Sequence, residues 1–439
     1  MLVGKKHLSS FQVVLYGFSL LILLGTFLLM TPMASAAHHW TSFADALFTS
    51  TSAVCVTGLV VRDTAAYWSF FGQFVIICLI QIGGLGIVIT AGAIAIASGR
   101  KIGLMQRSTL QDSLSAPKLG GIVRLTGFIV KGVFLIEGIG ALILMTRFIP
   151  QFGMAKGIWY GIFHSISALC NAGFDLMGHF RSLTQYVSDP VVSITIACLI
   201  IIGGLGFLTW NDFYQYRFHF RRYSLQSKLI LVITSLLIGL PTLYFYFFEY
   251  SSYTGLTRWL ISFFQAVTPR TAGFNTADLS TLSETGVMVM IFLMLTGGSP
   301  GSTAGGMKTT TLGVLFLSAK AILMREDKPS AFNRSISADT ISTSLTLSVM
   351  YVSLCVIGGC LISRYEGLPL LTCLFETASA IGTVGLTLGI TTRLSLFSRA
   401  ILVALMFIGR IGGMTMIYAI FANARQKHAH CVEEKIIVG

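Results

Sequence analysis

One short pattern, a phenylalanine followed ten residues later by a glycine, recurs four times, each time between two long apolar segments. The glycines are Gly58, Gly173, Gly273 and Gly385, preceded by Phe48, Phe163, Phe263 and Phe375 and spaced by 115, 100 and 112 residues. An internal repeat of this kind indicates that one structural unit is copied along the chain. We therefore expect four quasi-equivalent units, at residues 1–99, 100–214, 215–328 and 329–439, the last including a cytoplasmic C-terminal tail.

The apolar segments predict a membrane protein. Of the 439 residues, 54% are hydrophobic and only 11% are charged. A soluble domain carries about 25% charged residues, and an apolar stretch of about 20 residues crosses a bilayer as a helix. The cysteines show no spacing typical of a zinc site or a disulfide framework. We expect an all-α integral membrane fold with no cofactor or transition-metal site in this chain.

Each unit is predicted to contain a helix, a re-entrant hairpin and a second helix, an order written M1–P–M2. The flanking spans are expected at 11–30 and 70–97, 122–148 and 191–210, 228–248 and 287–318, and 341–363 and 395–421. The segments between them, at 43–52, 158–169, 258–267 and 370–380, are about half as long as a spanning helix. A strip of non-helical backbone that returns from membrane depth must be buried in protein or line a cavity. The four strips are therefore expected around one central axis.

The strips predict an ion-binding function, because backbone carbonyls are their main polar groups. Rings of carbonyls replace the water around a dehydrated cation, and glycine allows backbones to meet at close range. No acidic or basic ring is visible in the sequence, which favours a monovalent cation. The expected filter residues are Val54, Cys55, Val56, Thr57 and Gly58; Leu169, Cys170, Asn171, Ala172 and Gly173; Arg270, Thr271, Ala272 and Gly273; and Ile381, Gly382, Thr383, Val384 and Gly385.

The distribution of lysine and arginine predicts the orientation. With the N-terminus inside, 17 basic residues fall in cytoplasmic segments and 9 in outer segments. The positive-inside rule then places both termini in the cytoplasm and brings all four hairpins in from outside. Topology accounts for the basic excess, so no nucleic-acid partner is expected. Membrane lipid is an expected partner. At the basic cluster 217–228, anionic headgroups and a cytoplasmic partner stay open as alternatives, although loop topology alone explains the cluster.

Three motifs carry a family resemblance: Thr51-Ser-Ala-Val-Cys-Val-Thr-Gly-Leu59, Arg270-Thr-Ala-Gly-Phe-Asn275 and Gln81-Ile-Gly-Gly-Leu-Gly86. Together with the M1–P–M2 units, they resemble the Ktr/Trk/HKT superfamily of potassium transporters, nearest to the membrane (KtrB-like) subunit of bacterial Ktr systems. The resemblance covers essentially the whole chain. It implies a pseudo-fourfold pore for K⁺ in the cell membrane. It also implies a homodimer and a cytoplasmic nucleotide-binding ring of the RCK type (KtrA-like).

In plant relatives, serine at the first filter glycine accompanies sodium transport, whereas all four positions here are glycine. The second and third strips differ from the Thr-Val-Gly of a symmetric potassium channel, which argues against equal coordination by all units.

A glycine-rich break in the third unit's second span predicts a gate. It consists of Gly297, Gly298, Ser299, Pro300, Gly301, Ser302, Thr303, Ala304, Gly305 and Gly306. Glycine and proline cost about 1 and about 3 kcal/mol relative to alanine inside a helix, so an ordinary helix cannot form there. The family resemblance implies an intramembrane gating loop below the filter. Arg410 lies inside an apolar span, and we expect it to donate to this loop and repel cations. Lys308 is expected either to share this role or to reach the membrane interface.

Other readings are weaker. The sequence contains no motif of an enzyme active site. The glycine runs at 83–86 and 203–206 lie in apolar spans, which favours close packing and hinge bending over nucleotide binding. Glu137 and Glu376 are polar groups at unusual places, and Glu376 is expected either to attract cations at the outer mouth or to cap the start of its half-helix. The alternatives that stay open are a sodium-selective pore, a sodium-coupled flux, and a secondary transporter for another solute, although the last class usually has two inverted halves.

Overall fold

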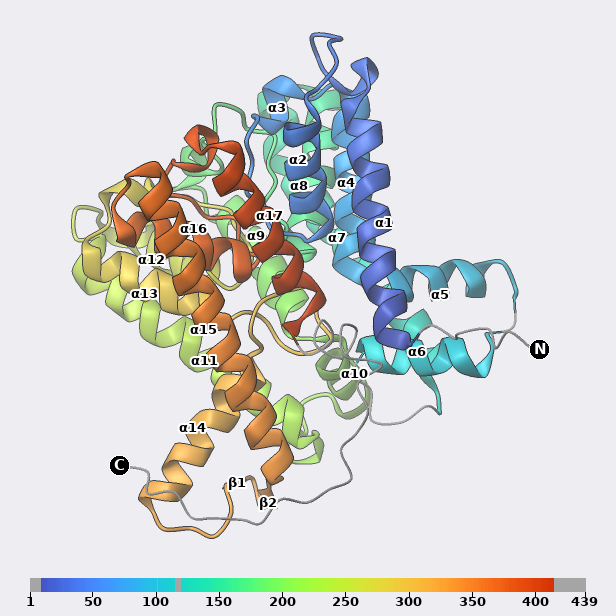
Figure 1. Ribbon diagram of the computed structural model, residues 1–439, viewed down its shortest axis with the longest axis vertical. Helices are drawn as coiled ribbons and strands as arrows, with labels where there is room; N and C mark the ends of the chain where they lie inside the picture. Colours follow the sequence, from blue (N-terminus) through green and yellow to red (C-terminus); the bar gives the residue numbers. More distant parts are fainter. Residues whose placement is uncertain (1–8, 101, 115–119, 414–439) are drawn as a thin grey trace.

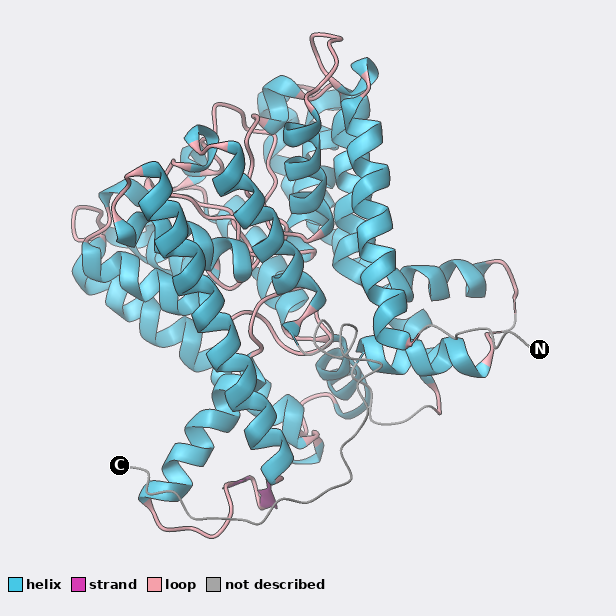
Figure 2. Cartoon of the chain, viewed as in Figure 1, coloured by secondary structure: helices cyan, strands magenta, loops and turns pink. Residues whose placement is uncertain are grey.

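The structure is a computed structural model in which residues 9–100, 102–114 and 120–413 are described, and every structural statement below concerns these residues. Helices make up nearly all of the regular structure, as Figure 2 shows. One antiparallel pair of two-residue strands, β1 (Ser330–Ala331) and β2 (Arg334–Ser335), lies at the start of the fourth unit. The all-α expectation is thus confirmed.

The first helix of each unit is long and apolar. These helices are α1 (Ser10–Met30), α7 (Ile122–Phe152), α11 (Leu225–Tyr244), which continues into a π-helical turn at Phe245–Glu249, and α15 (Ala338–Glu366). Each is long enough to cross a bilayer, and at most about a third of its most apolar window is buried within the protein. The exposed remainder carries side chains such as Leu20, Phe27 and Leu142, as expected for a surface that faces lipid.

The second helix is interrupted in the first three units, and in the fourth its described part ends at Ile411. The pieces are α4 (Phe70–Leu85) and α5 (Ile87–Ala97), α9 (Pro190–Gly204) and α10 (Phe207–Tyr216), α13 (Glu284–Leu295) and α14 (Thr309–Leu323), and α17 (Leu396–Ile411). The expectation of single spans at 70–97 and 191–210 is therefore wrong, since both bend by 96°. Gly86, Gly206 and Gly412 share a φ of +89°, a conformation that other residues rarely adopt. The hinge expected at the first two glycine runs is confirmed, and residues after 413 lie outside the described part.

Four short helices lie between these pairs and end near the centre of the molecule (Figure 1). They are α2 (Phe43–Val54), α8 (Met154–Leu169), α12 (Gly255–Val267) and α16 (Leu370–Ile381), close to the predicted half-helices. Their C-terminal turns are almost fully buried, so the protein core surrounds the four strips.

Smaller elements complete the chain. They are the helices α3 (Thr64–Tyr67) and α6 (Leu104–Leu114). There are also 3₁₀ turns, at Pro32–Ala34, Thr184–Tyr186, Phe220–Arg222, Leu279–Thr281 and Thr391–Arg393. In Figure 1, α3 and the loops that follow the strips lie at the upper end, and α5, α6, α10 and the β1–β2 pair lie toward the lower end.

Candidate functional site

The four filter glycines form a closed ring. A Cβ added to Gly58 would lie 2.5 Å from the carbonyl oxygen of Ala172, and one added to Gly173 would lie 2.7 Å from that of Ala272. The same construction at Gly273 meets Val384 O, and at Gly385 it meets Thr57 O, which closes the circle. The units therefore follow one another around an axis in sequence order. Any side chain at these positions would displace backbone of the next strip.

Three of the four strips begin with the same helix ending. In α2, α8 and α16 the residue two positions before the ring glycine has a left-handed φ: Val56 +55°, Asn171 +57° and Thr383 +51°. The next amide donates back to the helix, from Thr57 to Ser52 O, from Ala172 to Ser167 O and from Val384 to Ser379 O. This is a Schellman motif, in which glycine normally takes the left-handed position. A β-branched residue in that region costs of the order of 1–3 kcal/mol and is found mainly at functional sites.

The helix endings leave the strip carbonyls free. Thr57, Ala172, Ala272 and Val384 have essentially no exposed surface. Within the described chain, their carbonyl oxygens accept no hydrogen bond, although their amides are all paired. Alternating right- and left-handed residues turn successive N–H groups to one side and hence the carbonyls to the other. Buried carbonyls without donors require an explanation in native proteins, and a cation is one.

The third strip departs from this pattern because Pro269 has no N–H to donate. Its helix α12 ends at Val267, six residues before Gly273, whereas the other three end four residues before theirs. Thr271 still has a left-handed φ of +66°. The side chain of Arg270 points behind the strip, where it is 5% exposed and donates to Thr234 Oγ1 of α11 at 3.3 Å. The strips are thus unequal in structure, as their sequences predicted.

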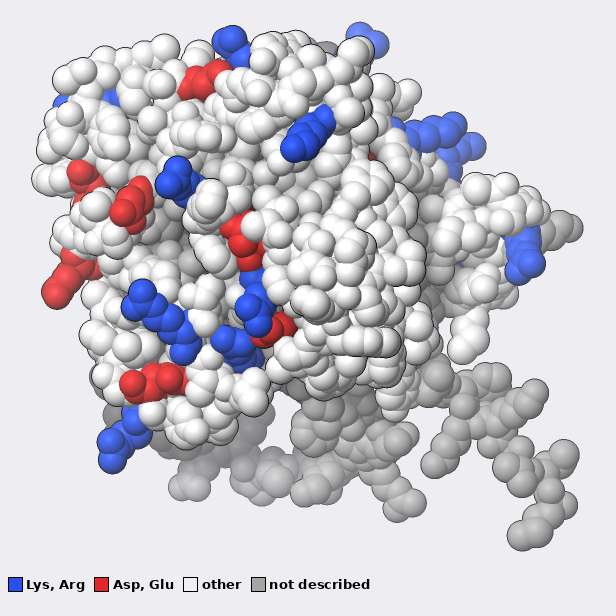
Figure 3. All heavy atoms as spheres, turned by 90° about the horizontal axis from the view of Figure 1, so that it is seen from above, with Lys and Arg blue, Asp and Glu red and all other residues white. Residues whose placement is uncertain are grey.

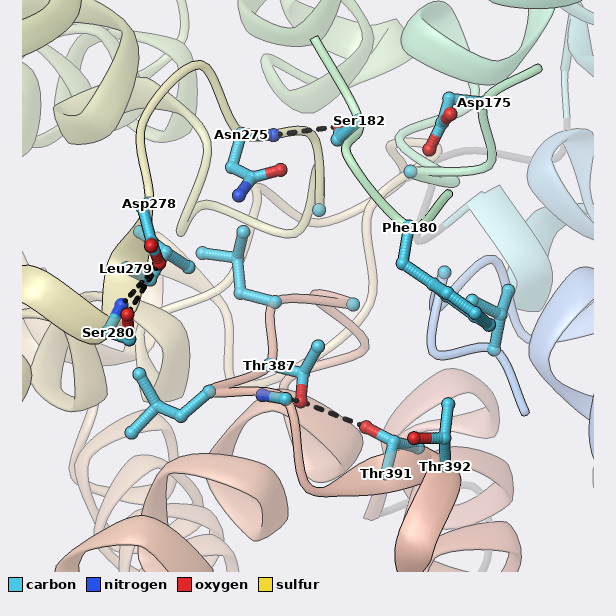
Figure 4. A pocket seen from close by; sticks show the side chains of 18 residues that line it. Asp175, Phe180, Ser182, Asn275, Asp278, Leu279, Ser280, Thr387, Thr391 and Thr392 are labelled. Carbon is cyan, nitrogen blue, oxygen red and sulfur yellow. Dashed lines mark hydrogen bonds between the residues drawn. The ribbon is translucent and has the colours of Figure 1, made fainter. Parts of the chain in front are cut away.

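Above the ring lies a cavity of about 410 Å³, lined by all four glycines. The residues two positions after the glycines, Val60, Asp175, Asn275 and Thr387, also line it. Figure 4 shows Asp175, Asn275 and Thr387 on three different loops around this space. Burial raises the pKa of the Asp175 carboxyl from 3.8 to about 6, and the nearby Asp63 carboxylate adds to the shift. Seen from this end, charged side chains of both signs are scattered over a mostly uncharged surface (Figure 3).

Below the ring, residues 297–306 form an irregular, mostly buried segment that we call the inner loop. It bonds to the second unit through Ser299 N to Gly204 O (3.0 Å) and Thr303 Oγ1 to Leu169 O (2.9 Å). It bonds to the fourth unit through Gly306 N to Gly409 O (3.2 Å). Contacts with units on opposite sides mean that the inner loop crosses the space under the ring.

Arg410, also in the fourth unit, holds the inner loop and links it to the first unit. Its guanidinium donates to Thr303 O of the loop and to Gly83 O and, at 2.8 Å, Gly84 O of α4. Lys308 also turns toward the loop, and its Nζ donates to Ala304 O at 2.9 Å. Both cationic side chains thus lie against the inner loop, as proposed for Arg410, and the interface position weighed for Lys308 is not adopted.

Several supporting residues were not recognised as such in the sequence. Ser50, Ser165 and Thr377 stand eight residues before their ring glycines, and each donates to a carbonyl of its unit's first helix: Ile22, Glu137 and Cys355. Aligning the repeats by their glycines would have revealed this hydroxyl position. Glu376 is fully buried in the middle of α16, where it accepts from Thr387 and Thr391. It therefore anchors the loop after strip four, and neither the outer-mouth role nor the capping role considered for it applies.

Among the described residues, no group of three or more His, Cys, Asp or Glu side chains is placed to hold a metal ion.

Comparison with known proteins gives a consistent result. Residues 6–428 match the family model TrkH, described as a cation transport protein. The potassium/sodium uptake protein NtpJ of Enterococcus hirae is 40% identical over 99% of this chain and 98% of its own. The Ktr system potassium uptake protein B of Bacillus subtilis is also 40% identical, over 98% of this chain and 96% of its own.

The crystal structure of the potassium transporter TrkH from Vibrio parahaemolyticus matches with a TM-score of 0.75 at 20% sequence identity, covering 97% of this chain and 87% of that one. The resemblance drawn from the motifs is confirmed, and the family comprises multi-pass membrane transporters rather than enzymes. The chain is a member of the TrkH family of cation transport proteins.

Proposed function

We propose that this protein takes up K⁺ across the cell membrane through the ring formed by its four strips. The observation that carries the proposal is the set of buried strip carbonyls that accept no hydrogen bond in the described chain. Four such strips around one axis offer oxygen ligands in place of the hydration shell of an alkali ion. The relatives named as potassium uptake proteins support K⁺ as the ion.

The growth of cells that lack potassium uptake systems tests this function directly. Expression of the wild-type chain is expected to restore growth at limiting K⁺, and purified protein in liposomes is expected to take up Rb⁺. Variants that carry serine at the ring glycines are expected to lose the rescue. Uptake of an organic solute instead of Rb⁺ would favour the secondary-transporter alternative.

A sodium-conducting pore is the second candidate, because one relative is named as a potassium/sodium uptake protein. The inequality of the third strip supports it, since a filter with unequal ligands discriminates less well between ions of different size. Competition between Na⁺ and Rb⁺ in the liposome assay distinguishes the two candidates. A K⁺ flux coupled to Na⁺ would instead require Na⁺ for Rb⁺ uptake.

The inner loop is proposed as the gate. Its position under the ring, its contacts with the second and fourth units and the two cations against it support a barrier to cations. Opening would require Arg410 to release the Thr303 carbonyl or the Gly83 and Gly84 carbonyls.

The likeness to a Ktr system protein supports a proposed assembly. We expect a homodimer, with a KtrA-like cytoplasmic nucleotide-binding ring docked on the basic inner face. The proposed orientation has both termini in the cytoplasm and the cavity of Asp175 outside.

A further inference from the structure

The buried carboxylate of Glu137 lies directly behind strip two. Glu137 is in the middle of α7 and is 4% exposed. Gln81 Nε2 of α4 donates to Glu137 Oε2 at 3.2 Å. The thiol of Cys170, in the strip itself, lies 3.9 Å from Glu137 Oε1 and 3.7 Å from Gln81 Oε1, within hydrogen-bond distance for sulfur. Among the described residues, Glu137 forms no ion pair, so hydrogen bonds account for its polar contacts.

We infer that Glu137 and Gln81 are positioning residues that hold strip two in its ion-binding conformation and thereby contribute to ion selectivity. This inference rests on the proposed function of the strips. The pair joins two units, because α4 belongs to the first and α7 to the second. It acts through Cys170, which is fully buried and cannot move away.

Close packing makes this contact rigid. Gly84 lies one helical turn after Gln81 on α4, and the two residues therefore share a face. A Cβ added to Gly84 would lie 2.7 Å from the sulfur of Cys170 and 2.8 Å from its Cβ. Cys170 is thus confined by the α4 backbone at Gly84 and by the side chains of Gln81 and Glu137. A confined side chain of this kind fixes the adjacent backbone, here the left-handed Asn171.

The restraint continues from strip two to strip three. Asn171 and Thr271, both left-handed, share a side-chain hydrogen bond of 3.2 Å across the boundary between the strips. Strip three lacks the Schellman ending of the others and is the least regular of the four. The contacts of Glu137 and Gln81 with strip two therefore also restrain strip three, through the hydrogen bond between Asn171 and Thr271.

The other units show that the pair is not a general requirement of the fold. The hydroxyl contacts of Ser50, Ser165 and Thr377 make Ile22 and Cys355 the counterparts of Glu137. Gly83, Gly203 and Gly409 each approach the carbonyl of the last residue of a short helix, α2, α8 or α16. Gln81 lies two positions before Gly83, so its counterparts are Ile201 and Phe407, two positions before Gly203 and Gly409. Uncharged residues suffice at these places. An amide of the first unit and a carboxyl group of the second, buried together at these places, therefore indicate a role beyond packing.

The test compares Glu137→Leu, Glu137→Gln and Gln81→Leu with wild type, using the full-length protein in liposomes. Half-saturation for Rb⁺ and inhibition of Rb⁺ uptake by Na⁺ are measured. We expect Glu137→Leu and Gln81→Leu to reduce the preference for Rb⁺ over Na⁺ by about tenfold, comparable to the loss of one strong buried hydrogen bond. Glu137→Gln keeps one oxygen acceptor toward Gln81 Nε2 and turns an amide donor toward the Cys170 sulfur, and it is expected to retain most of the preference.

Ile22→Leu and Ile201→Leu, at the counterpart positions, serve as matched controls and are expected to leave the preference unchanged. The double variant Glu137→Leu/Gln81→Leu is expected to lose no more than either single variant, because the two residues act as one pair. If Glu137→Leu does not fold, Gln81→Leu carries the test alone. An unchanged Na⁺ inhibition in a folded leucine variant overturns the inference, whereas failure of the wild type to take up Rb⁺ overturns the proposed function.

Discussion

Left-handed residues set the shape of each strip. Val56, Thr271 and Thr383 are β-branched, and Asn171 completes the set, so three of four strips place a disfavoured residue where glycine would be relaxed. Glycine at these places would also be free to leave the left-handed region. A strained residue that is held by its surroundings gives a more rigid strip, provided that the contacts behind it persist.

Replacement of Gly58 by serine tests the ring at one residue. Its φ of +91° and the close approach of Ala172 O leave no room for a side chain, so strips one and two must separate. We expect the preference for Rb⁺ over Na⁺ to fall by about tenfold, because a wider ring no longer matches the size of the ion. Competition assays in liposomes measure it. Gly367→Ser is the control, since Gly367 has a φ of +68° but nothing within 4 Å of an added Cβ. Equal losses in both variants would attribute the effect to backbone strain alone.

Asp175 predicts a dependence on external pH. Its pKa is raised to about 6 by burial and by Asp63, so the carboxyl is ionised above that pH and neutral below it. Because a negative charge beside the ring concentrates cations, half-saturation for Rb⁺ is expected to rise several-fold as the external pH falls from about 7.5 to about 5. Asp175→Asn should behave like the acidified wild type at every pH. The other groups close to this carboxyl are Asp63 and Tyr160, and Asp63→Asn is expected to lower the pH at which the change occurs. A wild-type profile that is flat across pH 6 would contradict the prediction.

Residue-level sequence reasoning located the ring glycines, the inner loop and Arg410, because glycine, proline and a charged residue in an apolar span are visible without coordinates. It could not find the Glu137–Gln81–Cys170 contact. Those residues are 33 and 89 positions away from Cys170 along the chain. Only the packing of α4 against α8 and of α7 against α8 brings them together. The left-handed Val56 and Thr383 were equally hidden, since their residue types argue against that conformation.

At the scale of elements, the repeat determines which segments are equivalent, and the breaks determine how they differ. The half-helices were predictable to within a few residues because their length and flanking spans recur. In the first two units, the sequence predicted a hinge at the glycine run but not that the span ends there with a bend of 96°. The reason is that an apolar run that continues through a glycine has the same composition as an unbroken helix. The third unit has an inner loop at its break, where the first two have only Gly86 and Gly206.

Shortening the inner loop tests its role as a gate. Deletion of residues 301–304 removes Thr303, with its contacts to Leu169 and Arg410, and opens the space below the ring. We expect the Rb⁺ flux to rise at least about tenfold, because the barrier formed by the loop and its two cations is lost. The preference for Rb⁺ over Na⁺ serves as an internal control and should change little, since the strips are retained. An unchanged flux with an intact preference would remove the gate assignment.

An ion-pair cluster joins the first and fourth units above the ring. Asp45 of α2, whose side chain is 7% exposed, contacts Arg62 at 2.9 Å and Arg399 of α17 at 3.0 Å. Asp45→Asn leaves two arginines without their carboxylate and is expected to destabilise the protein by about 1–3 kcal/mol. Thermal unfolding in detergent measures this. Arg147→Ala breaks the more exposed pair with Asp189, at 3.4 Å, and should cost less than about 1 kcal/mol. Equal shifts in the two variants would argue against a special role for the cluster.

At the scale of the whole molecule, the ring and the inner loop depend on all four units. Each ring glycine contacts the next strip, so no unit can move independently without disturbing its neighbours. The inner loop adds contacts from the third unit to the second and fourth, and Arg410 adds the first. A force on any inner segment would therefore reach the inner loop through a connected set of contacts.

The orientation of the molecule is the prediction on which the direction of transport depends. Basic residues favour the cytoplasm for both termini and for the loop between α10 and α11, which holds Arg217, Arg221 and Arg222. A green fluorescent protein fused after residue 439 is expected to fluoresce, because it folds in the cytoplasm. Alkaline phosphatase fused after Ala37, beyond the outer end of α1, is expected to be active, because it matures only outside.

The reversed pattern would turn the Asp175 cavity toward the cytoplasm. The pH dependence predicted for Asp175 would then follow the internal pH, so the fusion reporters and the uptake assay must agree. Agreement on an outer cavity makes the strips the first protein ligands that an entering ion meets and leaves the inner loop as the last barrier before the cytoplasm.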